Sequence, residues 1–170
     1  MGSTMTATRI DRGSTPTTTI YSEGGDLSFV RTFDAPRVRV WQAFTDPAIV
    51  PLWWGQKGST TVVEQMDVRP GGKWRYVSSA ADRDDVVFYG EYLSITPPEG
   101  FDWTFMFDVP GVGPQGGPES HRFEDLGGKT RVISVGHMGS PEMLEGALAS
   151  GMAEGAIETW DRLEAVLAEG

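Results

Sequence analysis

The chain has 170 residues, no cysteine and a formal net charge of −10. This length fits one domain, the lack of cysteine excludes disulfides and thiolate metal sites or catalysis, and the acidic balance disfavours nucleic acids and anionic membranes as partners. No apolar run approaches the roughly 20 residues of a membrane-spanning helix, so no membrane insertion is predicted. The absence of cysteine fits a reducing cytosol, and a cytoplasmic location is expected.

The N-terminal segment, residues 1–24, is rich in Thr, Ser and Gly, which predicts a mobile arm. An edge strand over residues 17–21 is the alternative for part of it. Residues 25–170 are expected to form a single domain. Its first strand is indicated by four residues that alternate with polar or smaller neighbours: Leu27, Phe29, Arg31 and Phe33.

Two short helices are predicted after this strand. Asp34 is placed to cap the first helix, with Pro36 in its first turn. Asp46-Pro47 begins the second helix by the same logic, and Gly55 ends it. Because Pro51 interrupts the second helix, it is expected to be short or broken.

The middle of the chain has the sequence pattern of several strands separated by turns. A Gly/Pro loop is predicted at residues 110–118. The clearest strand is Phe101–Val109, where aromatic residues take one face and polar residues the other. The strands predicted in this part cover residues 60–68, 73–80, 86–95, 101–109, 121–126 and 130–138.

A long helix is predicted at the C-terminus. Ser140-Pro141-Glu142 supplies an N-cap, a proline at the first position and an acid in the first turn. An apolar stripe at helical spacing runs to about Ala168. Three glycines interrupt it, which indicates either room for a close neighbour or ligand, or a bent helix: Gly146, Gly151 and Gly155.

Antiparallel strands with helices at the two ends predict an α+β fold. One strongly curved sheet wrapped around the long C-terminal helix satisfies this order. A gap between such a sheet and its helix is a common place for a ligand pocket.

Several motifs, in order, resemble a known bacterial family: Arg31-Thr-Phe-Asp-Ala-Pro36, Val40-Trp-Gln-Ala-Phe-Thr-Asp-Pro47, Trp53-Trp54-Gly55, Asp67-Val-Arg-Pro-Gly-Gly-Lys-Trp-Arg-Tyr76, Gly90-Glu-Tyr-Leu-Ser-Ile95, Gly151-Met-Ala-Glu-Gly155 and Asp161-Arg-Leu163. They are similar to single-domain proteins related to the C-terminal half of the activator of the ninety-kilodalton heat-shock-protein ATPase. That family lies in the START-like, birch-pollen-allergen-like helix-grip superfamily, and the resemblance covers roughly residues 26–168.

The resemblance implies a helix-grip fold with about six or seven strands. It also implies a cavity, since superfamily relatives bind lipids, sterols, plant hormones or polyketides, and a minority are cyclases, dehydratases or hydroxylase subunits. Two departures affect the expected pocket floor. Gln56 stands where the family usually has proline, and Ala156 stands where many members have an aromatic residue, with Trp160 one turn later.

No catalytic, cofactor or metal site is predicted. Gly111-Val-Gly-Pro-Gln-Gly116 satisfies G-x-G-x-x-G, but it contains a proline and precedes a strand rather than a helix, which indicates a loop. His121 and His137 lack metal-ligand spacing, and each is interpreted as a hydrogen-bonded sheet residue, with an acid–base role as the alternative. Ser120 and His121 are adjacent on a strand and therefore point to opposite faces.

Two charged residues are predicted to face the core. Glu64 shares the parity of Val62 and Met66, and Arg31 that of Phe29. Because an isolated buried charge is costly, each needs a partner. The hypothesis is that one or both anchor a ligand, and the alternative is a structural ion pair or a wet strand end.

The strongest functional signal is the set of aromatic residues on single faces of neighbouring strands. They indicate a pocket wall, with ordinary core packing as the alternative. The residues expected to line the cavity are Trp54, Glu64, Trp74, Tyr76, Phe88, Tyr92, Trp103, Phe105, Phe107, His121, Met152 and Trp160.

The leading functional prediction is a domain that binds a small apolar or amphipathic molecule between sheet and helix. The alternatives are a cyclase- or dehydratase-type enzyme using the same cavity, and a co-chaperone or other protein-interaction module. A homodimer is compatible with all three.

Overall fold

The protein is described by a computed structural model that covers residues 8–109, 111 and 113–169. Nine strands form one sheet, in which every neighbouring pair is antiparallel, in the order β1-β2-β3-β9-β8-β7-β6-β5-β4. The strands are β1 (Arg9–Asp11), β2 (Thr19–Glu23), β3 (Asp26–Phe33), β4 (Thr60–Met66), β5 (Lys73–Ala80), β6 (Arg83–Thr96), β7 (Gly100–Val109), β8 (Gly113–Asp125) and β9 (Thr130–His137).

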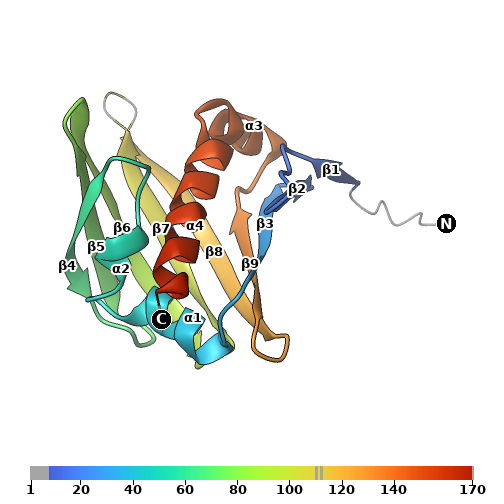
Figure 1. The fold of residues 1–170 in the computed structure, drawn as a ribbon. Helices are drawn as coiled ribbons and strands as arrows, with labels where there is room; N and C mark the ends of the chain where they lie inside the picture. The colour runs from blue at the N-terminus through green and yellow to red at the C-terminus, as the bar shows by residue number, and fades with distance from the viewer. Residues whose placement is uncertain (1–7, 110, 112, 170) are drawn as a thin grey trace.

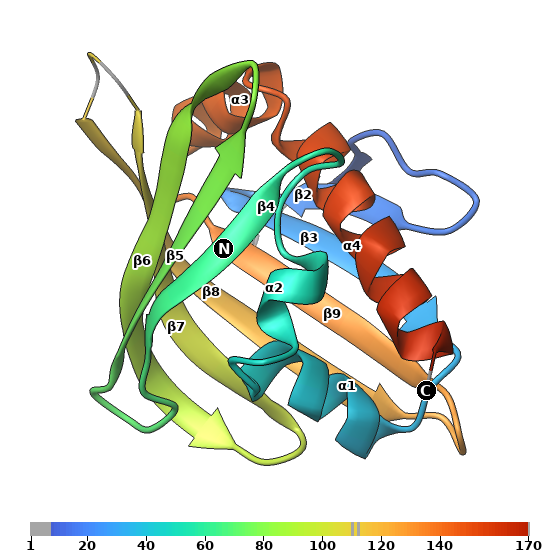
Figure 2. The ribbon, with the colours of Figure 1, turned by 60° about the vertical axis from the view of Figure 1, so that its left-hand side comes forward.

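The sheet curves around the C-terminal helix, as the sequence predicted. Figure 1 shows α4 (Met152–Ala168) lying across the hollow of the sheet, and the turned view of Figure 2 places it over β3 and β9. The short helices α1 (Arg37–Thr45) and α2 (Val50–Trp53) lie across the same hollow beside the C-terminal end of α4 (Figure 2). The predicted α+β helix-grip architecture is confirmed.

The predicted C-terminal helix is divided in two. α3 (Pro141–Ala149) begins at the expected cap, where the Ser140 side chain accepts a hydrogen bond from the Met143 N–H at 3.2 Å. The chain then turns at Gly151, whose φ of 90° lies in the left-handed region that glycine adopts without strain. Gly151 therefore ends one helix and begins the next, whereas Gly155 lies within α4.

The sheet has more strands than the six or seven expected, because it begins earlier in the chain. Ile20 of β2 pairs with Phe29 of β3, so the strand considered for residues 17–21 is present, over Thr19–Glu23. It is not at the edge of the sheet as expected, because β1 pairs with its other side. Of the predicted mobile arm, Arg9–Asp11 and Thr19–Glu23 belong to the sheet, and residues 1–7 lie outside the described residues.

Three local predictions are wrong. The second helix does not begin at Asp46-Pro47, because α2 starts at Val50 and its N-cap is Ile49. The N-cap of α1 is Pro36, which makes no side-chain cap bond, so Asp34 does not cap the helix. Much of the predicted loop at residues 110–118 belongs to β8, where Gly117 pairs with Phe105 and Pro118 with Thr104. Pairing with β7 outweighs the local turn preference of glycine and proline.

The core lies between the concave face of the sheet and the helices. Trp53 of α2 is 1% exposed and donates its indole N–H to the Ala43 carbonyl oxygen at 2.9 Å, which ties α2 to α1. Leu163 of α4 is fully buried against the same cluster. The concave face is therefore filled at the end of the molecule where the three helices meet.

Candidate functional site

Aromatic side chains cover the concave face of β5, β6 and β7, as the alternating sequence pattern predicted. Trp74 of β5 stacks on Trp103 of β7, with ring centroids 4.1 Å apart and planes 16° apart. Trp54, which follows α2, inserts from the helical side, with its ring 4.9 Å from Tyr76 and 5.7 Å from Phe88. Side chains distant in the sequence thus form one aromatic cluster.

The position of Trp54 is fixed by α4. Arg162 of α4 donates from one guanidinium nitrogen, Nη1, to the carbonyl oxygens of Gly55 at 3.0 Å, Gln56 at 3.1 Å and Trp54 at 3.4 Å. The Thr159 hydroxyl donates to the same Gly55 oxygen at 3.2 Å. Hydrogen bonds from a charged donor are stronger than neutral ones, so this contact holds the loop after α2 against the helix.

The aromatic cluster has a buried floor and an accessible rim. The floor consists of Trp74, Tyr76, Tyr92 and Trp103, none of which is more than 1% exposed. The rim consists of Trp54, Phe88, Phe105 and Phe107, which are partly exposed although the register of the sheet turns the three phenylalanines inward. Large apolar side chains therefore meet solvent on the concave side.

The two predicted site residues of α4 lie differently. Met152, at the N-terminal end of the helix, is half-buried and packs against the core cluster. Trp160 is 7% exposed and packs edge-on against Phe29 at 6.3 Å and Phe33 at 5.7 Å. Trp160 therefore fills the space between α4 and β3 and belongs to the core away from the aromatic rim.

The predicted inward position of Glu64 is wrong. A β-bulge between Val63 and Gln65 adds one residue to β4, so Met66 faces Trp74 on the inside while Val62 is 62% exposed. Glu64 lies on the outer face and pairs with Arg75, at 2.7 Å between Oε1 and Nε. A bulge inverts the parity on which the prediction depended.

Arg31 does face the interior, as predicted, and its partners come from α4. The Arg31 side chain is 1% exposed, and its guanidinium nitrogens lie 2.8 Å from an Asp161 carboxylate oxygen and 3.3 Å from one of Glu164. This arrangement is the structural ion pair that was the alternative to a ligand anchor.

A chain of hydrogen bonds crosses the concave face beside the aromatic cluster. In His121 of β8, Nδ1 lies 2.6 Å from the Ser134 hydroxyl oxygen, and Nε2 lies 2.7 Å from Glu119 Oε1. Trp103 donates its indole N–H to the same Glu119 oxygen at 2.9 Å. The interior carboxylate is therefore Glu119, which the sequence analysis did not select, although it shares the parity of His121 and Phe123.

Two tyrosine hydroxyls lie buried in the floor. The hydroxyl oxygens of Tyr76 and Tyr92 make no hydrogen bond of acceptable geometry with any described residue. Burial raises the pKa of Tyr92 to about 12, although the nearby Tyr76 hydroxyl opposes this shift. Burial also raises the pKa of Tyr76 well above its usual range, with a smaller contribution in the same direction from Tyr92. Both phenols therefore stay neutral at physiological pH.

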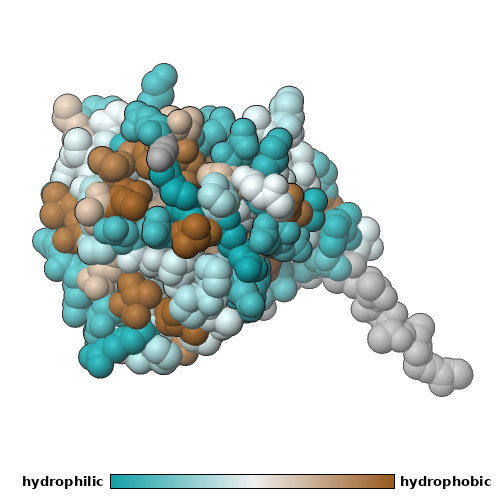
Figure 3. Space-filling view, turned by 60° about the horizontal axis from the view of Figure 1, so that its bottom comes forward, coloured by the Kyte–Doolittle hydropathy of each residue, from teal (hydrophilic) through white to brown (hydrophobic). Residues whose placement is uncertain are grey.

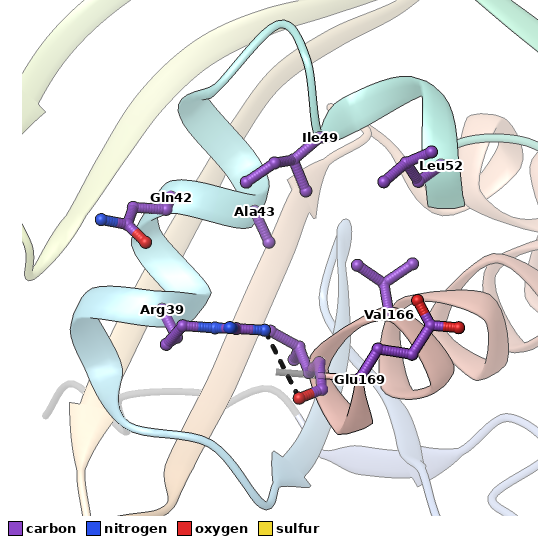
Figure 4. A pocket seen from close by; sticks show the side chains of 8 residues that line it. Arg39, Gln42, Ala43, Ile49, Leu52, Val166 and Glu169 are labelled. Carbon is purple, nitrogen blue, oxygen red and sulfur yellow. Dashed lines mark hydrogen bonds between the residues drawn. The ribbon is translucent and has the colours of Figure 1, made fainter.

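Two surface hollows are present besides this cluster, and Trp74 of the cluster contributes to the lining of the second. One, of about 240 Å³, is formed by α1, the start of α2 and the end of α4, where Arg39 donates to the Leu167 carbonyl oxygen (Figure 4). Apolar residues form separate patches at the end of the molecule seen in Figure 3. The other hollow, of about 360 Å³, lies over β5, β6 and β7 and is lined by residues that include Arg75, Tyr89 and Met106.

Within residues 8–109, 111 and 113–169, no three His, Asp or Glu side chains gather as a metal site would require. No helix in that part of the chain is long and apolar enough to cross a bilayer.

A curved antiparallel sheet closed around a C-terminal helix, with an aromatic concave face, defines a helix-grip domain. The chain belongs to the family described as Activator of Hsp90 ATPase homolog 1-like protein, whose sequence pattern matches residues 34–168. The resemblance noted from the sequence motifs is thereby confirmed.

Solved bacterial structures share this fold. Protein Ms6760 from Mycobacterium smegmatis is 28% identical, with a TM-score of 0.75 over 85% of this chain and 91% of that one. A protein from Arthrobacter aurescens (24% identity, TM-score 0.81, 89% and 91% covered) and the AHSA1 protein from Silicibacter pomeroyi (20%, 0.68, 84% and 97%) share the fold. No curated protein matches the chain.

Proposed function

We propose that the protein binds a small apolar or amphipathic molecule on the concave face, between the sheet and α4. The observation that carries this proposal is the rim of partly exposed aromatic side chains above a buried floor. Inward-facing Phe88, Phe105 and Phe107 leave apolar surface in contact with water. Burying that surface under an apolar ligand is favourable by about 25 cal/mol per Å².

The proposal is tested by native mass spectrometry of the protein purified from the organism that encodes it. We expect an additional mass that is released on denaturation and is lost in Phe105→Ser. The control is Leu93→Ser, since Leu93 is 47% exposed and contacts solvent in the free protein. The same spectra report whether the protein is a homodimer. Equal retention by both variants would contradict the proposed site.

A second candidate is an enzyme that uses the same face, and the contact between His121 and Glu119 favours it. A histidine held by a carboxylate on one side and a hydroxyl on the other is arranged for proton transfer. In that case His121→Gln retains the bound molecule but stops its conversion, which mass spectrometry of the small molecule would detect. Conversion at an unchanged rate would remove His121 from the reaction.

A third candidate is a protein-interaction module of the co-chaperone kind named in the family description. It is favoured by the hollow beside α2, where Leu52 is 57% exposed. Leu52→Asp would then weaken binding to the heat-shock ATPase of the same organism, and an unchanged affinity would count against this surface. For all three candidate functions we propose a cytoplasmic location, with which the lack of cysteine is compatible.

A further inference from the structure

We propose that the concave face selects a ligand that carries a positively charged nitrogen on an apolar body, and that Glu119 binds this nitrogen. The inference rests on the proposed binding function and adds the chemical class of the ligand to it.

The Glu119 carboxylate uses one oxygen within the protein and leaves the other available. Oε1 accepts from the Trp103 indole at 2.9 Å and lies 2.7 Å from His121 Nε2. Oε2 makes no hydrogen bond to any described residue, and 18% of the side-chain surface remains exposed. A carboxylate fixed through one oxygen presents the other at a defined position, which is the geometry of a preorganised anchor.

The charge of Glu119 has no cationic partner of its own. Among the described residues, its ion-pair contact is with His121 alone, and no lysine or arginine pairs with it. A neutral imidazole satisfies both contacts of His121, because Nε2–H donates to Glu119 while Nδ1 accepts from the Ser134 hydroxyl. With His121 in this neutral tautomer, the partly buried carboxylate lacks the counter-charge that such a group normally has.

His121 is itself held rigidly, so the anchor does not depend on a mobile group. Its ring packs 4.8 Å from Phe101 and 5.7 Å from Phe44, and it is 6% exposed. The carboxylate is consequently locked by one aromatic donor and one packed imidazole.

The concave face beside Glu119 carries a small residue on the side of the partly exposed aromatic residues. Gly117, two residues earlier on β8, pairs with the half-exposed Phe105, and a Cβ added at Gly117 would meet only the His137 carbonyl oxygen, at 3.2 Å. On β9 the residue opposite Glu119 is Gly136, and a Cβ added there would meet the end of the Met138 side chain, at 2.9 Å, so the free space lies on the Gly117 side. An apolar body therefore has room over Gly117 and against Phe105, whose ring face also attracts cations.

The test uses three probes with the same aromatic body: 1-naphthylmethylammonium, 1-naphthalenemethanol and 1-naphthaleneacetate. Affinities are measured by isothermal titration calorimetry at pH 7 in low salt. We expect the ammonium compound to bind about tenfold more tightly than the alcohol, as a charge-assisted hydrogen bond provides, and the carboxylate compound to bind most weakly. In Glu119→Gln the preference for ammonium over alcohol should disappear.

The matched control is Glu124→Gln, on the same strand but on the outer face, where Glu124 pairs with Arg131 at 2.9 Å. This variant should keep the preference. Because Gln can still accept from Trp103 and His121, Glu119→Gln is expected to fold, and thermal unfolding verifies this. The comparison of the three probes on the unaltered protein needs no variant at all.

The outcomes separate this inference from the function on which it rests. If the ammonium and alcohol probes bind the unaltered protein equally, or if the preference survives in Glu119→Gln, the assignment of Glu119 is overturned while small-molecule binding stands. If none of the naphthalene probes binds, both the inference and the proposed function fail.

Discussion

Replacing Trp74 by alanine tests whether the aromatic floor is packed core or the wall of an open cavity. Trp74 is 1% exposed, stacks on Trp103 at 4.1 Å and donates its indole N–H to the Thr104 carbonyl oxygen at 3.2 Å. Truncation of a core tryptophan costs about 3–5 kcal/mol. Trp74→Ala also removes a stacked ring pair, which contributes about 1 kcal/mol, and a hydrogen bond, which contributes about 1 kcal/mol. We therefore expect a loss near the upper end, about 4–5 kcal/mol.

The assay is guanidinium chloride unfolding followed by far-UV circular dichroism. The midpoint should fall while the m-value stays unchanged, and the melting temperature should fall by roughly 8–20 °C for a chain of this length. Trp74→Phe is the control. It keeps a stacked ring and loses the N–H, so it should cost only about 1–2 kcal/mol. A loss below about 1 kcal/mol for Trp74→Ala would refute the packed floor.

Three further predictions concern the other contacts that hold the site. Arg162→Met keeps the aliphatic stem but removes the bonds to the carbonyls after α2, and chemical denaturation should report a loss of about 2–3 kcal/mol; a neutral result would contradict the role given to this arginine. The double change Asp161→Asn with Glu164→Gln leaves the buried Arg31 charge without a partner, so it should lower the free energy of unfolding more than Arg31→Met does. A larger loss for Arg31→Met would contradict this expectation. The pKa of Tyr92 is raised to about 12 in the folded protein, whereas an unfolded tyrosine titrates near 10. The neutral Tyr92 therefore contributes fully to the free energy of unfolding below pH 10, and this contribution is lost as the pH rises from 10 to 12. The free energy of unfolding of Tyr92→Phe should fall less steeply over that pH window than that of the unaltered protein. If the two proteins lose stability with pH at the same rate, Tyr92 is not the cause of the loss.

The general architecture was readable from the sequence because its signals are local. Phe101, Trp103 and Phe105 alternate along one strand, and this period of two assigns their face without knowledge of any partner. The start of α3 was likewise set by Ser140 and the proline after it. Each of these features depends on residues within a few positions of one another, which a single sequence contains.

The interior carboxylate was misplaced because its position depends on pairing between strands. One bulged residue in β4 turns Glu64 outward. Glu119 follows Pro118 and Gly117, whose composition predicted a loop, so its parity with His121 was not extended to it. Only the ladder between β7 and β8, with Trp103 opposite Glu119, places it on the concave face.

The residues that reveal the family and the residues proposed to choose the ligand are different, and the contacts explain why. Arg162 and the Trp53-Trp54-Gly55 segment meet through backbone carbonyl oxygens, a contact that fixes the fold whatever occupies the concave face. Glu119 instead holds its place through a histidine and an indole that lie outside the sequence motifs that carried the resemblance. A family match through the first set therefore establishes the scaffold, whereas ligand chemistry has to be argued from the second set, residue by residue.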